Sequence, residues 1–417
     1  MKFIFTLILT LAFFICEGQP VQLIELSSNN AKVSPIKDDL LIVEGDRLVR
    51  FSPETGTSSV LAEERGLSLK GVLKGRYVYF SSISKRSFDL YCYDNYKGSC
   101  LKLKTFRSLD NFVAQGGDMF FIADDGEVGR ELWRSSKGRY PQLVADLIPG
   151  QEDGFDRSNG LLVSSDKHVY FKTKDNRLWK SNGRNRGTKI LACFNEYGLN
   201  ARIGTLGVLG SKLYFSIEGY NRKNYFRELW TSDEKSNGAM KVKTIDDFSN
   251  IGVIDCYTKG HDGYVYFFHY YDYHSELWKT NGTAKGTEKI KTLGEGVPFE
   301  LSVVNDKLVF YTLTEASVFD IWVSDGTGQG TTVLQSLQNV PRSSIPLAVS
   351  GDRFWYVDDG KLWEADPFAK NINALDGKFA AFSDISNIKI LFPHKHELYF
   401  TGETSAGNLF LYVYKPK

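Results

Sequence analysis

The chain has 417 residues, and its 51 Lys and Arg residues nearly balance its 50 Asp and Glu residues, which leaves a net charge of +1. This neutral balance argues against polyanionic partners, so we expect neither nucleic acid nor an anionic membrane surface as a ligand. Aromatic residues make up 14% of the chain, and 38 glycines stand beside only 11 prolines. That composition favours many short strands joined by tight turns over helices or a disordered tail.

Residues 1–18 have the layout of a secretory signal peptide. An apolar run, 3–15, follows Lys2 and is too short to span a bilayer. The small residues Cys16 and Gly18 predict cleavage after Gly18 and a mature chain of residues 19–417. Acylation of Cys16 is the weaker alternative, because bulky residues precede that cysteine. No later stretch has membrane-spanning length, so we expect a secreted protein, extracellular or at the cell surface, and a monomer.

Paired β-rich runs then recur along the whole chain, each with apolar residues at alternate positions. Nine such units can be counted, each typical of a four-stranded propeller blade with strands a to d. Six units carry a tryptophan on strand c, at intervals of 41 to 51 residues, which is the period of a propeller blade. The tryptophans are Trp133, Trp179, Trp230, Trp278, Trp322 and Trp363.

The sequence therefore predicts an all-β fold, a single β-propeller of nine four-stranded antiparallel blades. The last unit has only three strands, whereas residues 21–26 (VQLIEL) form a strand without a blade of its own. We expect this N-terminal strand to complete the last blade and close the ring, which removes exposed sheet edges. An eight-bladed ring with extra strands is the second choice.

The tryptophans are predicted to pack between blades rather than to form a surface platform, with Val49 and Tyr91 in the equivalent positions of the first two units. After strand c comes a turn such as Asn281-Gly282 or Asp325-Gly326, in which glycine supplies a positive φ angle. We interpret them as structural turns rather than as phosphate-binding loops, because no helix N-terminus follows to receive an anion.

These units resemble the ELWxxDGTxxGT repeat, a repeat of secreted proteins known mostly from bacterial surface and extracellular proteins. Residues 276–287 (ELWKTNGTAKGT) and 320–331 (DIWVSDGTGQGT) keep nearly all of that pattern, and 124–133 (DDGEVGRELW) matches the connection between strands b and c. The first, second and last units lose the Trp and DGT elements. The resemblance implies a propeller-like fold and assigns no catalytic residue, because the motif is a folding motif.

Four cysteines follow the predicted signal peptide. Cys92 and Cys100 flank a hairpin, and in a secreted chain a disulfide between them is a fair prediction. Cys193 and Cys256 lie in different repeats, where burial as small side chains is at least as good an explanation as a bridge. Asn281 lies in the one N-x-S/T sequon and would carry a glycan only in a eukaryotic host.

Two loops between strands b and c stand out as ligand-binding candidates, 218–227 (EGYNRKNYFR) and 269–274 (HYYDYH), on consecutive units. They combine aromatic faces with hydrogen-bond donors, a composition that suits sugar rings or a protein partner, although ordinary solvated loops have it too. The candidate residues are Tyr220, Arg222, Asn224, Tyr225, Tyr270, Tyr271 and Tyr273.

Catalytic and metal-binding signals are weak. His269, Asp272 and His274 have the residue types of a metal site, but they come from one short segment with no fourth ligand in view, so we predict no metal and no other cofactor. No G-x-S-x-G elbow occurs after the signal peptide, and the six histidines are scattered.

Two functions of different class remain. The first is a secreted, non-catalytic binding or adhesion module that recognises an extracellular glycan or protein through loops on one propeller face. The second is a secreted glycan-active lyase or hydrolase with a central propeller pocket, which would need two or more carboxylates or a His/Tyr pair to converge. The missing catalytic signature favours the first.

Overall fold

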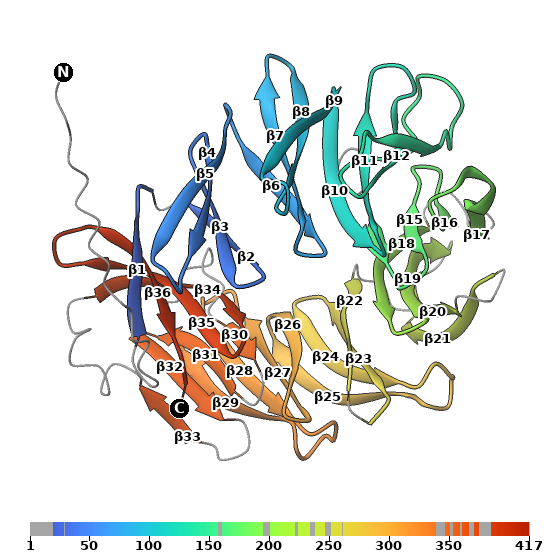
Figure 1. The fold of residues 1–417 in the computed structure, drawn as a ribbon. Helices are drawn as coiled ribbons and strands as arrows, with labels where there is room; N and C mark the ends of the chain where they lie inside the picture. Colours follow the sequence, from blue (N-terminus) through green and yellow to red (C-terminus); the bar gives the residue numbers. More distant parts are fainter. Residues whose placement is uncertain are drawn as a thin grey trace, which may run out of the picture.

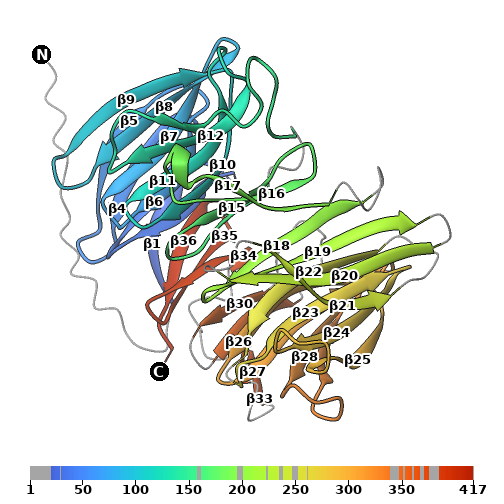
Figure 2. The ribbon, with the colours of Figure 1, turned by 90° about the vertical axis from the view of Figure 1, so that its right-hand side faces the viewer.

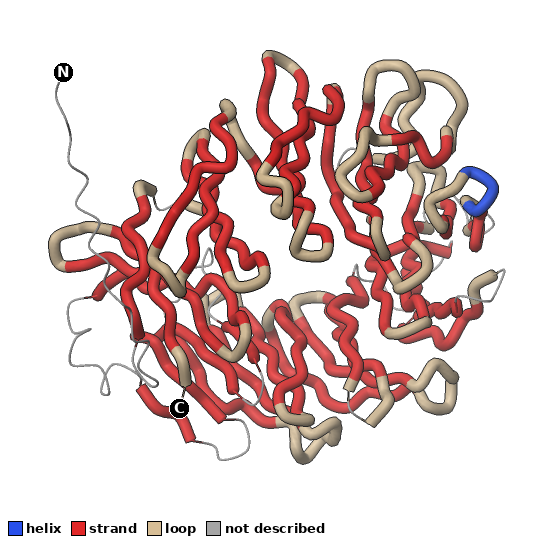
Figure 3. The backbone as a smooth tube through the Cα atoms, viewed as in Figure 1, coloured by secondary structure: helices blue, strands red, loops and turns tan. Residues whose placement is uncertain are grey.

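The computed structural model describes residues 20–416 apart from 29, 157–160, 195–200, 222–223, 234–237, 247–251, 261, 339–346, 351–352, 359–360, 367–370 and 375–384. Nearly all regular structure in this part of the chain is β-strand, with a single 3₁₀ turn, η1 (Asn185–Gly187) (Figure 3). Among these residues, no helix has the length and apolar character that crossing a membrane requires.

The strands form nine four-stranded antiparallel sheets arranged in a ring, so the predicted nine-bladed propeller is confirmed and the eight-bladed alternative is wrong (Figure 1). Within blades 1 to 8 the strands pair in chain order, from strand a at the centre of the ring to strand d at the rim. The first four blades are β2 (Lys32–Ile36), β3 (Asp39–Glu44), β4 (Arg47–Ser52), β5 (Thr57–Glu63); β6 (Ser68–Leu73), β7 (Tyr77–Ser84), β8 (Ser87–Asp94), β9 (Ser99–Phe106); β10 (Ser108–Gln115), β11 (Asp118–Asp124), β12 (Arg130–Ser136), β13 (Gln142–Ala145); and β14 (Leu162–Ser164), β15 (Val169–Lys172), β16 (Arg177–Ser181), β17 (Lys189–Cys193).

The remaining blades continue around the ring, and blade 4 lies between blades 1–3 and blades 5–8 in the side view (Figure 2). Blades 5 to 9 are β18 (Arg202–Leu209), β19 (Lys212–Asn221), β20 (Asn224–Asp233), β21 (Met240–Asp246); β22 (Gly252–Lys259), β23 (Val265–Tyr271), β24 (His274–Thr280), β25 (Thr287–Glu295); β26 (Val297–Val304), β27 (Lys307–Leu313), β28 (Phe319–Ser324), β29 (Thr332–Leu337); β30 (Leu347–Ser350), β31 (Arg353–Asp358), β32 (Lys361–Asp366), β33 (Asn371–Ala374); and β34 (Ile385–His394), β35 (Glu397–Thr404), β36 (Leu409–Tyr414) with β1 (Pro20–Leu26).

The N-terminal strand closes the ring as predicted. β1 pairs with β36 in antiparallel register from Pro20 opposite Tyr414 to Leu26 opposite Leu409, and it supplies strand d of blade 9. Leu26 is buried in a cluster that joins blade 9 to blade 1. The two ends of the described chain therefore share one sheet, which leaves no unpaired edge on β36.

The core is divided among the interfaces between blades. The described residues form nine hydrophobic clusters, one at each interface between neighbouring blades around the ring. In every blade, strand c contributes a leucine or isoleucine that is almost fully buried. These residues are Leu48, Leu90, Leu132, Leu178, Leu229, Leu277, Ile321, Leu362 and Leu411.

The tryptophan directly follows this buried residue and packs as predicted. Trp278 is 9% exposed, and its ring stacks on Phe267 of the neighbouring strand with centroids 6.2 Å apart. The register between strands c and d shifts at the Leu-Trp step, for example between Leu277 and Trp278, which places a β-bulge there. Val49 and Tyr91 occupy the same place in blades 1 and 2, each beside an equivalent shift.

Side-chain hydrogen bonds hold the Asn-Gly and Asp-Gly turns in place, which agrees with their interpretation as structural turns. The Thr280 hydroxyl accepts a bond of 2.9 Å from the amide of Gly282, whose φ is +87°, and it shares a second bond with Thr287. The Asn281 amide oxygen accepts bonds from Thr283, and a Cβ at Gly286 would collide with Asn281. Blade 7 repeats this arrangement around Asp325.

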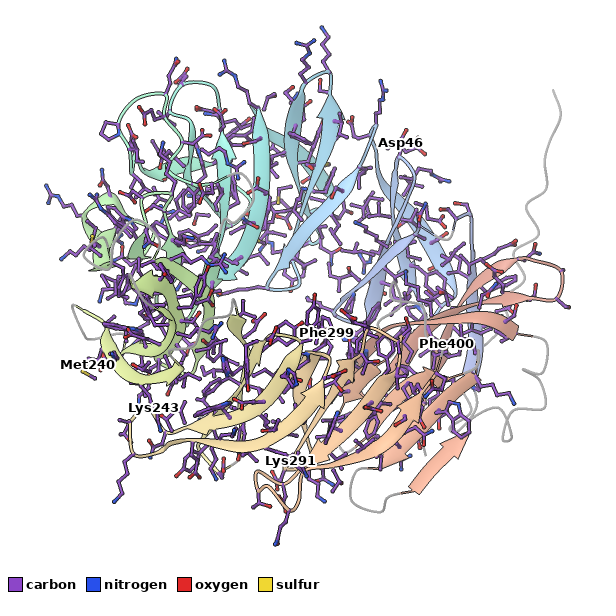
Figure 4. All side chains as sticks on the ribbon, turned by 180° about the vertical axis from the view of Figure 1, so that it is seen from behind. Asp46, Met240, Lys243, Lys291, Phe299 and Phe400 are labelled. Carbon is purple, nitrogen blue, oxygen red and sulfur yellow. The ribbon has the colours of Figure 1, made fainter. Side chains whose placement is uncertain are left out.

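The same turns contact the neighbouring blade. A Cβ at Gly326 in blade 7 would collide with the Tyr266 hydroxyl of blade 6, and one at Gly183 in blade 4 would lie 2.9 Å from Phe120 of blade 3. Lys243 and Lys291 donate from strand d of blades 5 and 6 to turn carbonyls of the next blade, with Nζ to O distances of 2.6 Å. Both lysines lie at the rim of the ring, whereas Phe299 of β26 lies toward its centre (Figure 4).

Deletion of residues 21–26 is expected to lower the melting temperature and to cause oligomerisation, because it exposes the edge of β36 and removes Leu26 from the closing cluster. Thermal melting and size-exclusion chromatography measure both effects. As a control, alanine at the exposed positions Gln22 and Glu25 should leave both unchanged. A deletion variant that melts and elutes like the parent would contradict ring closure by β1.

Trp278→Ala should reduce the free energy of unfolding by about 3 to 5 kcal/mol, the usual cost of removing a large buried aromatic side chain. The substitution also removes the 2.9 Å bond that the indole N–H donates to Glu276. Trp278→Phe keeps most of the ring contact and should cost clearly less. Denaturant unfolding measures both values, and parental stability of the alanine variant would show that this ring is not a packing residue.

Candidate functional site

The candidate loops lie on the face where the b–c and d–a connections of the blades meet. In blade 5, the hairpin of β19 and β20 brings Tyr220 and Tyr225 into a cross-strand pair with ring centroids 5.1 Å apart. Tyr220 is 40% exposed at this tip. Arg222 lies outside the described residues, and Asn224 lies on β20 with its side chain outside them. The structure thus places two of the four predicted blade 5 residues side by side.

In blade 6, the predicted tyrosines divide between two environments. Tyr271 stacks on the buried ring of His269, with centroids 4.7 Å apart, and its hydroxyl lies 3.5 Å from a carboxylate oxygen of Glu276. Tyr271 is half-buried, and its ring and hydroxyl are engaged by buried polar side chains of the blade. Tyr270 is half-buried and Tyr273 is 59% exposed at the hairpin turn between β23 and β24. These two tyrosines are available to a ligand.

Tyr270 and Tyr273 line a groove of about 680 Å³ between blades 6 and 7, which we call the 6–7 groove. The groove combines the β23–β24 turn with the link from β25 to β26 and the end of β27. Its volume lies in the range of small-ligand sites. The lining residues are Tyr270, Asp272, Tyr273, His274, Glu295, Gly296, Val297, Leu313, Thr314 and Glu315.

The backbone around the groove is fixed by hydrogen bonds. The Gly296 amide donates to the Tyr273 carbonyl at 2.8 Å, and the Ser275 hydroxyl donates to the Gly296 carbonyl at 2.9 Å. Gly296 has a φ of +128°, and a Cβ there would lie 3.1 Å from the carbonyl oxygen of Leu313. Glycine is needed at this position, because the link from blade 6 to blade 7 passes so close to β27.

The groove contains acidic side chains beside its aromatic rings. Asp272, Glu295 and Glu315 all line it, and no lysine or arginine is among its described lining residues. Burial raises the pKa of Tyr270, and the negative charges of Glu315 and Asp272 together with the neighbouring Tyr273 raise it further.

Sequence reasoning missed the part of the groove that comes from outside the β23–β24 turn. Glu295, Gly296 and Val297 belong to the d–a link, and Leu313, Thr314 and Glu315 belong to the start of the next b–c connection. The signal that could have found them is topological, because the d–a link and the following b–c loop share a face with the tyrosine-rich turn.

A buried polar cluster lies on β23, β24 and β25, the three strands that carry part of the groove lining. The Glu276 carboxylate accepts bonds from Trp278 Nε1 at 2.9 Å and Lys289 Nζ at 2.9 Å, and it lies 3.1 Å from His269 Nδ1. Burial alone would raise the pKa of Glu276, but hydrogen bonds from His269, Lys289 and Trp278 outweigh it and lower the pKa to about 2. Glu276 is thus a stable anion that positions β23 against β24.

The acid–lysine pair within this cluster recurs in other blades. An acidic residue two positions before the strand-c aromatic residue pairs with a lysine on strand d that lies 13 residues later. This spacing brings the two side chains together across the c–d hairpin. The pairs are Asp89 with Lys102, Glu228 with Lys241, and Glu276 with Lys289.

Glu131 occupies the same position in blade 3 but has no lysine opposite it, because Val144 lies 13 residues later. Its carboxylate instead faces the backbone amides of Leu147 and Ile148, at 3.0 and 3.4 Å, and the side chain is completely buried. Burial raises the pKa of Glu131 to about 8, although these amides oppose the rise. The same motif position therefore holds an anion in blade 6 and a largely neutral acid in blade 3.

The predicted disulfide is wrong in the structure, where Cys92 and Cys100 are free thiols. Cys100 lies opposite Tyr93 in the β8–β9 register, so it projects from the face of the blade opposite to Cys92. Cys92 is buried beside Gly138 of blade 3, whereas Cys100 is exposed on the outer strand. Cys193 is also a free, exposed thiol, and Cys256 lies on β22 with its side chain outside the described residues.

The remaining candidates do not converge. His269 is buried against Glu276, whereas the exposed His274 contacts the Asp272 carbonyl through Nδ1 at 2.7 Å. In the described part of the chain, no three His, Cys, Asp or Glu side chains are grouped so that they could hold a metal ion. Asn281 is exposed in its turn, with its amide oxygen engaged by Thr283.

Comparison with known proteins supports the fold alone. No protein-family profile and no curated protein matches the chain. Dipeptidyl peptidase 4 from Porphyromonas gingivalis is structurally similar, with a TM-score of 0.56 and 12% identity over 91% of this chain and 65% of that chain. Two further structures are less similar. An oligogalacturonate lyase has a TM-score of 0.45 and 13% identity over 84% of this chain and 99% of that chain. A dihydro-heme d1 dehydrogenase has a TM-score of 0.49 and 15% identity over 86% of this chain and 77% of that chain. At these identities only the propeller architecture is shared.

The two glutamates should give the stability of the protein opposite dependences on pH. The Glu131 pKa is raised above the ordinary glutamate value of 4.5, so its contribution to stability is fully present below pH 4.5 and is lost as the pH rises through about 8. Glu131→Gln removes this loss and should stabilise the protein above pH 8 by on the order of 5 kcal/mol relative to the parent.

Glu276→Gln is the matched comparison. In the parent, the lowered pKa of Glu276 contributes stability that is present above pH 4.5 and is lost as the pH falls toward 2. This variant should therefore be less stable than the parent at neutral pH, and the difference should shrink in acid. Unfolding curves from pH 3 to 9 measure both trends. Equal pH dependence of the parent and Glu131→Gln would show that Glu131 does not titrate in this way.

Proposed function

We propose that this chain is a secreted binding module that recognises an extracellular glycan or protein through the 6–7 groove. The observation that carries the proposal is the groove itself. Tyr270 and the exposed Tyr273 line it, and backbone hydrogen bonds fix its walls, on the face of the propeller where the b–c loops lie. Rigid aromatic side chains at the wall of a preformed groove are typical contact residues in recognition.

Export and the repeat family form part of the same proposal. Residues 1–18 have the pattern of a signal peptide, and the ELWxxDGT-like units have the pattern of a secreted repeat. The hydrogen bonds around Asn281 and Asp325 indicate that the repeated motif has a structural role, since they hold a turn in place. A folding repeat that builds a scaffold leaves the variable loops of the opposite face for binding.

A glycan-active lyase or hydrolase is the second candidate. It is favoured by one observation, that three carboxylates, His274 and Tyr273 line the same groove, because such enzymes need carboxylates or a His/Tyr pair close together. The groove lies between blades 6 and 7, whereas the sequence suggested a central propeller pocket for this activity. Product analysis of any glycan that binds distinguishes the two candidates.

The proposal is tested by a screen of the exported protein against glycans and protein ligands, followed by titration of each ligand found. Alanine at both Tyr270 and Tyr273 should weaken binding at least tenfold, which corresponds to about 1.4 kcal/mol or more. The melting temperature should change little, because Tyr273 is mostly exposed.

The matched variant carries alanine at Tyr220 and Tyr225, the aromatic pair on the adjacent blade of the same face. It should retain binding. Loss of binding in this variant alone would move the site to the blade 5 hairpin and overturn the assignment to the 6–7 groove. Turnover of a bound glycan would favour the lyase or hydrolase instead.

A further inference from the structure

The 6–7 groove combines negative charge with aromatic surface. Asp272 and Glu295 come from its two sides, the β23–β24 turn and the end of β25, and Glu315 lines it from blade 7. The described lining residues include no lysine or arginine, and the proposal uses only Asp272 and Glu295. A ligand that enters it therefore meets an excess of negative charge.

The aromatic rings strengthen the same preference. Tyr273 is 59% exposed, and the two-residue turn that carries it is fixed by the pairing of Tyr271 with His274. Both turn residues have positive φ angles, 47° for Asp272 and 63° for Tyr273, which matches a tight hairpin turn. The turn thus holds a carboxylate and a phenol ring next to each other, an arrangement that attracts a cation through charge and through the π face.

The acidic side chains of the groove are spread along it rather than gathered around one point. In the described part of the chain, no three of the acidic and histidine side chains come together closely enough to hold one metal ion. The negative charge is instead spread along a groove of about 680 Å³, large enough for several side chains of a peptide. A guanidinium can bond a carboxylate through two parallel N–H groups and also stack on an aromatic ring.

We propose that the 6–7 groove binds an arginine- or lysine-containing peptide segment of a protein partner, with carboxylates of Asp272 and Glu295 pairing with its cationic side chains and Tyr273 stacking on them. This inference rests on the proposed function, since it names the ligand class of the same groove. Repulsion from the same carboxylates disfavours a uronate-containing glycan, and a neutral glycan would gain nothing from their charge.

The experiment uses the mature chain and four probes of similar length: tetra-arginine, tetra-lysine, tetra-glutamine and tetragalacturonate. The two basic peptides should bind, and their dissociation constants should rise at least tenfold between 50 and 500 mM NaCl because salt screens ion pairs. Tetra-glutamine and tetragalacturonate should bind at least tenfold more weakly than tetra-arginine. Chito-oligosaccharide, as a neutral glycan, completes the set.

The decisive variant is Asp272→Asn with Glu295→Gln, which removes two charges and keeps the shape of the side chains. It should weaken tetra-arginine binding at least tenfold without changing the melting temperature. The matched control is Glu54→Gln with Glu127→Gln, which removes the same charge from exposed positions on blades 1 and 3. This control should bind tetra-arginine as the parent does, so an equal loss in both variants would show a general charge effect and overturn the inference.

Two further outcomes separate this inference from the proposed function. Binding of the neutral glycan that depends on Tyr270 and Tyr273 but not on Asp272 and Glu295 would overturn the cationic ligand and leave the binding groove intact. If alanine at both tyrosines leaves the binding of every probe and every glycan unchanged, both proposals are overturned.

Discussion

The structure depends on the contact between neighbouring blades. A four-stranded sheet exposes two apolar faces, so no blade can bury its strand-c leucine alone, and Leu132 or Leu277 becomes fully buried only when the next blade covers it. The nine interface clusters form a closed series because β1 pairs with β36 and brings Leu26 to the first blade. The turn glycines have the same origin, since Gly326 must fit against Tyr266 of the blade before it.

This scaffold separates folding residues from residues available for recognition. One face of the ring carries the repeated Asn-Gly and Asp-Gly turns, whose side chains are engaged in hydrogen bonds within the turn. The other face carries connections that vary from blade to blade, and the 6–7 groove forms there. Its shape depends on Gly296, where a Cβ would lie only 3.1 Å from the Leu313 carbonyl oxygen.

Identical motif positions acquire different chemistry from their neighbours. Glu131 and Glu276 both precede a Leu-Trp pair, yet Glu276 meets Lys289 and His269 while Glu131 meets backbone amides alone. The first is held as an anion, and burial keeps the second protonated over a wider pH range. The absence of a lysine 13 residues after Glu131 can be read from the sequence, but its effect on the pKa appears only once burial is known.

The sequence by itself determined the propeller, its nine blades, the packing role of Trp278 and the closing strand, because these follow from a local period that every unit repeats. It also determined that the tyrosine-rich turn is a candidate site, since Tyr270 and Tyr273 line the groove. The tertiary structure alone decided that Tyr271 stacks on His269, that Cys92 and Cys100 project from opposite faces, and that Glu295 and Leu313 complete the groove. These facts depend on strand register and on which blades become neighbours, and neither is written in the local spacing of residues.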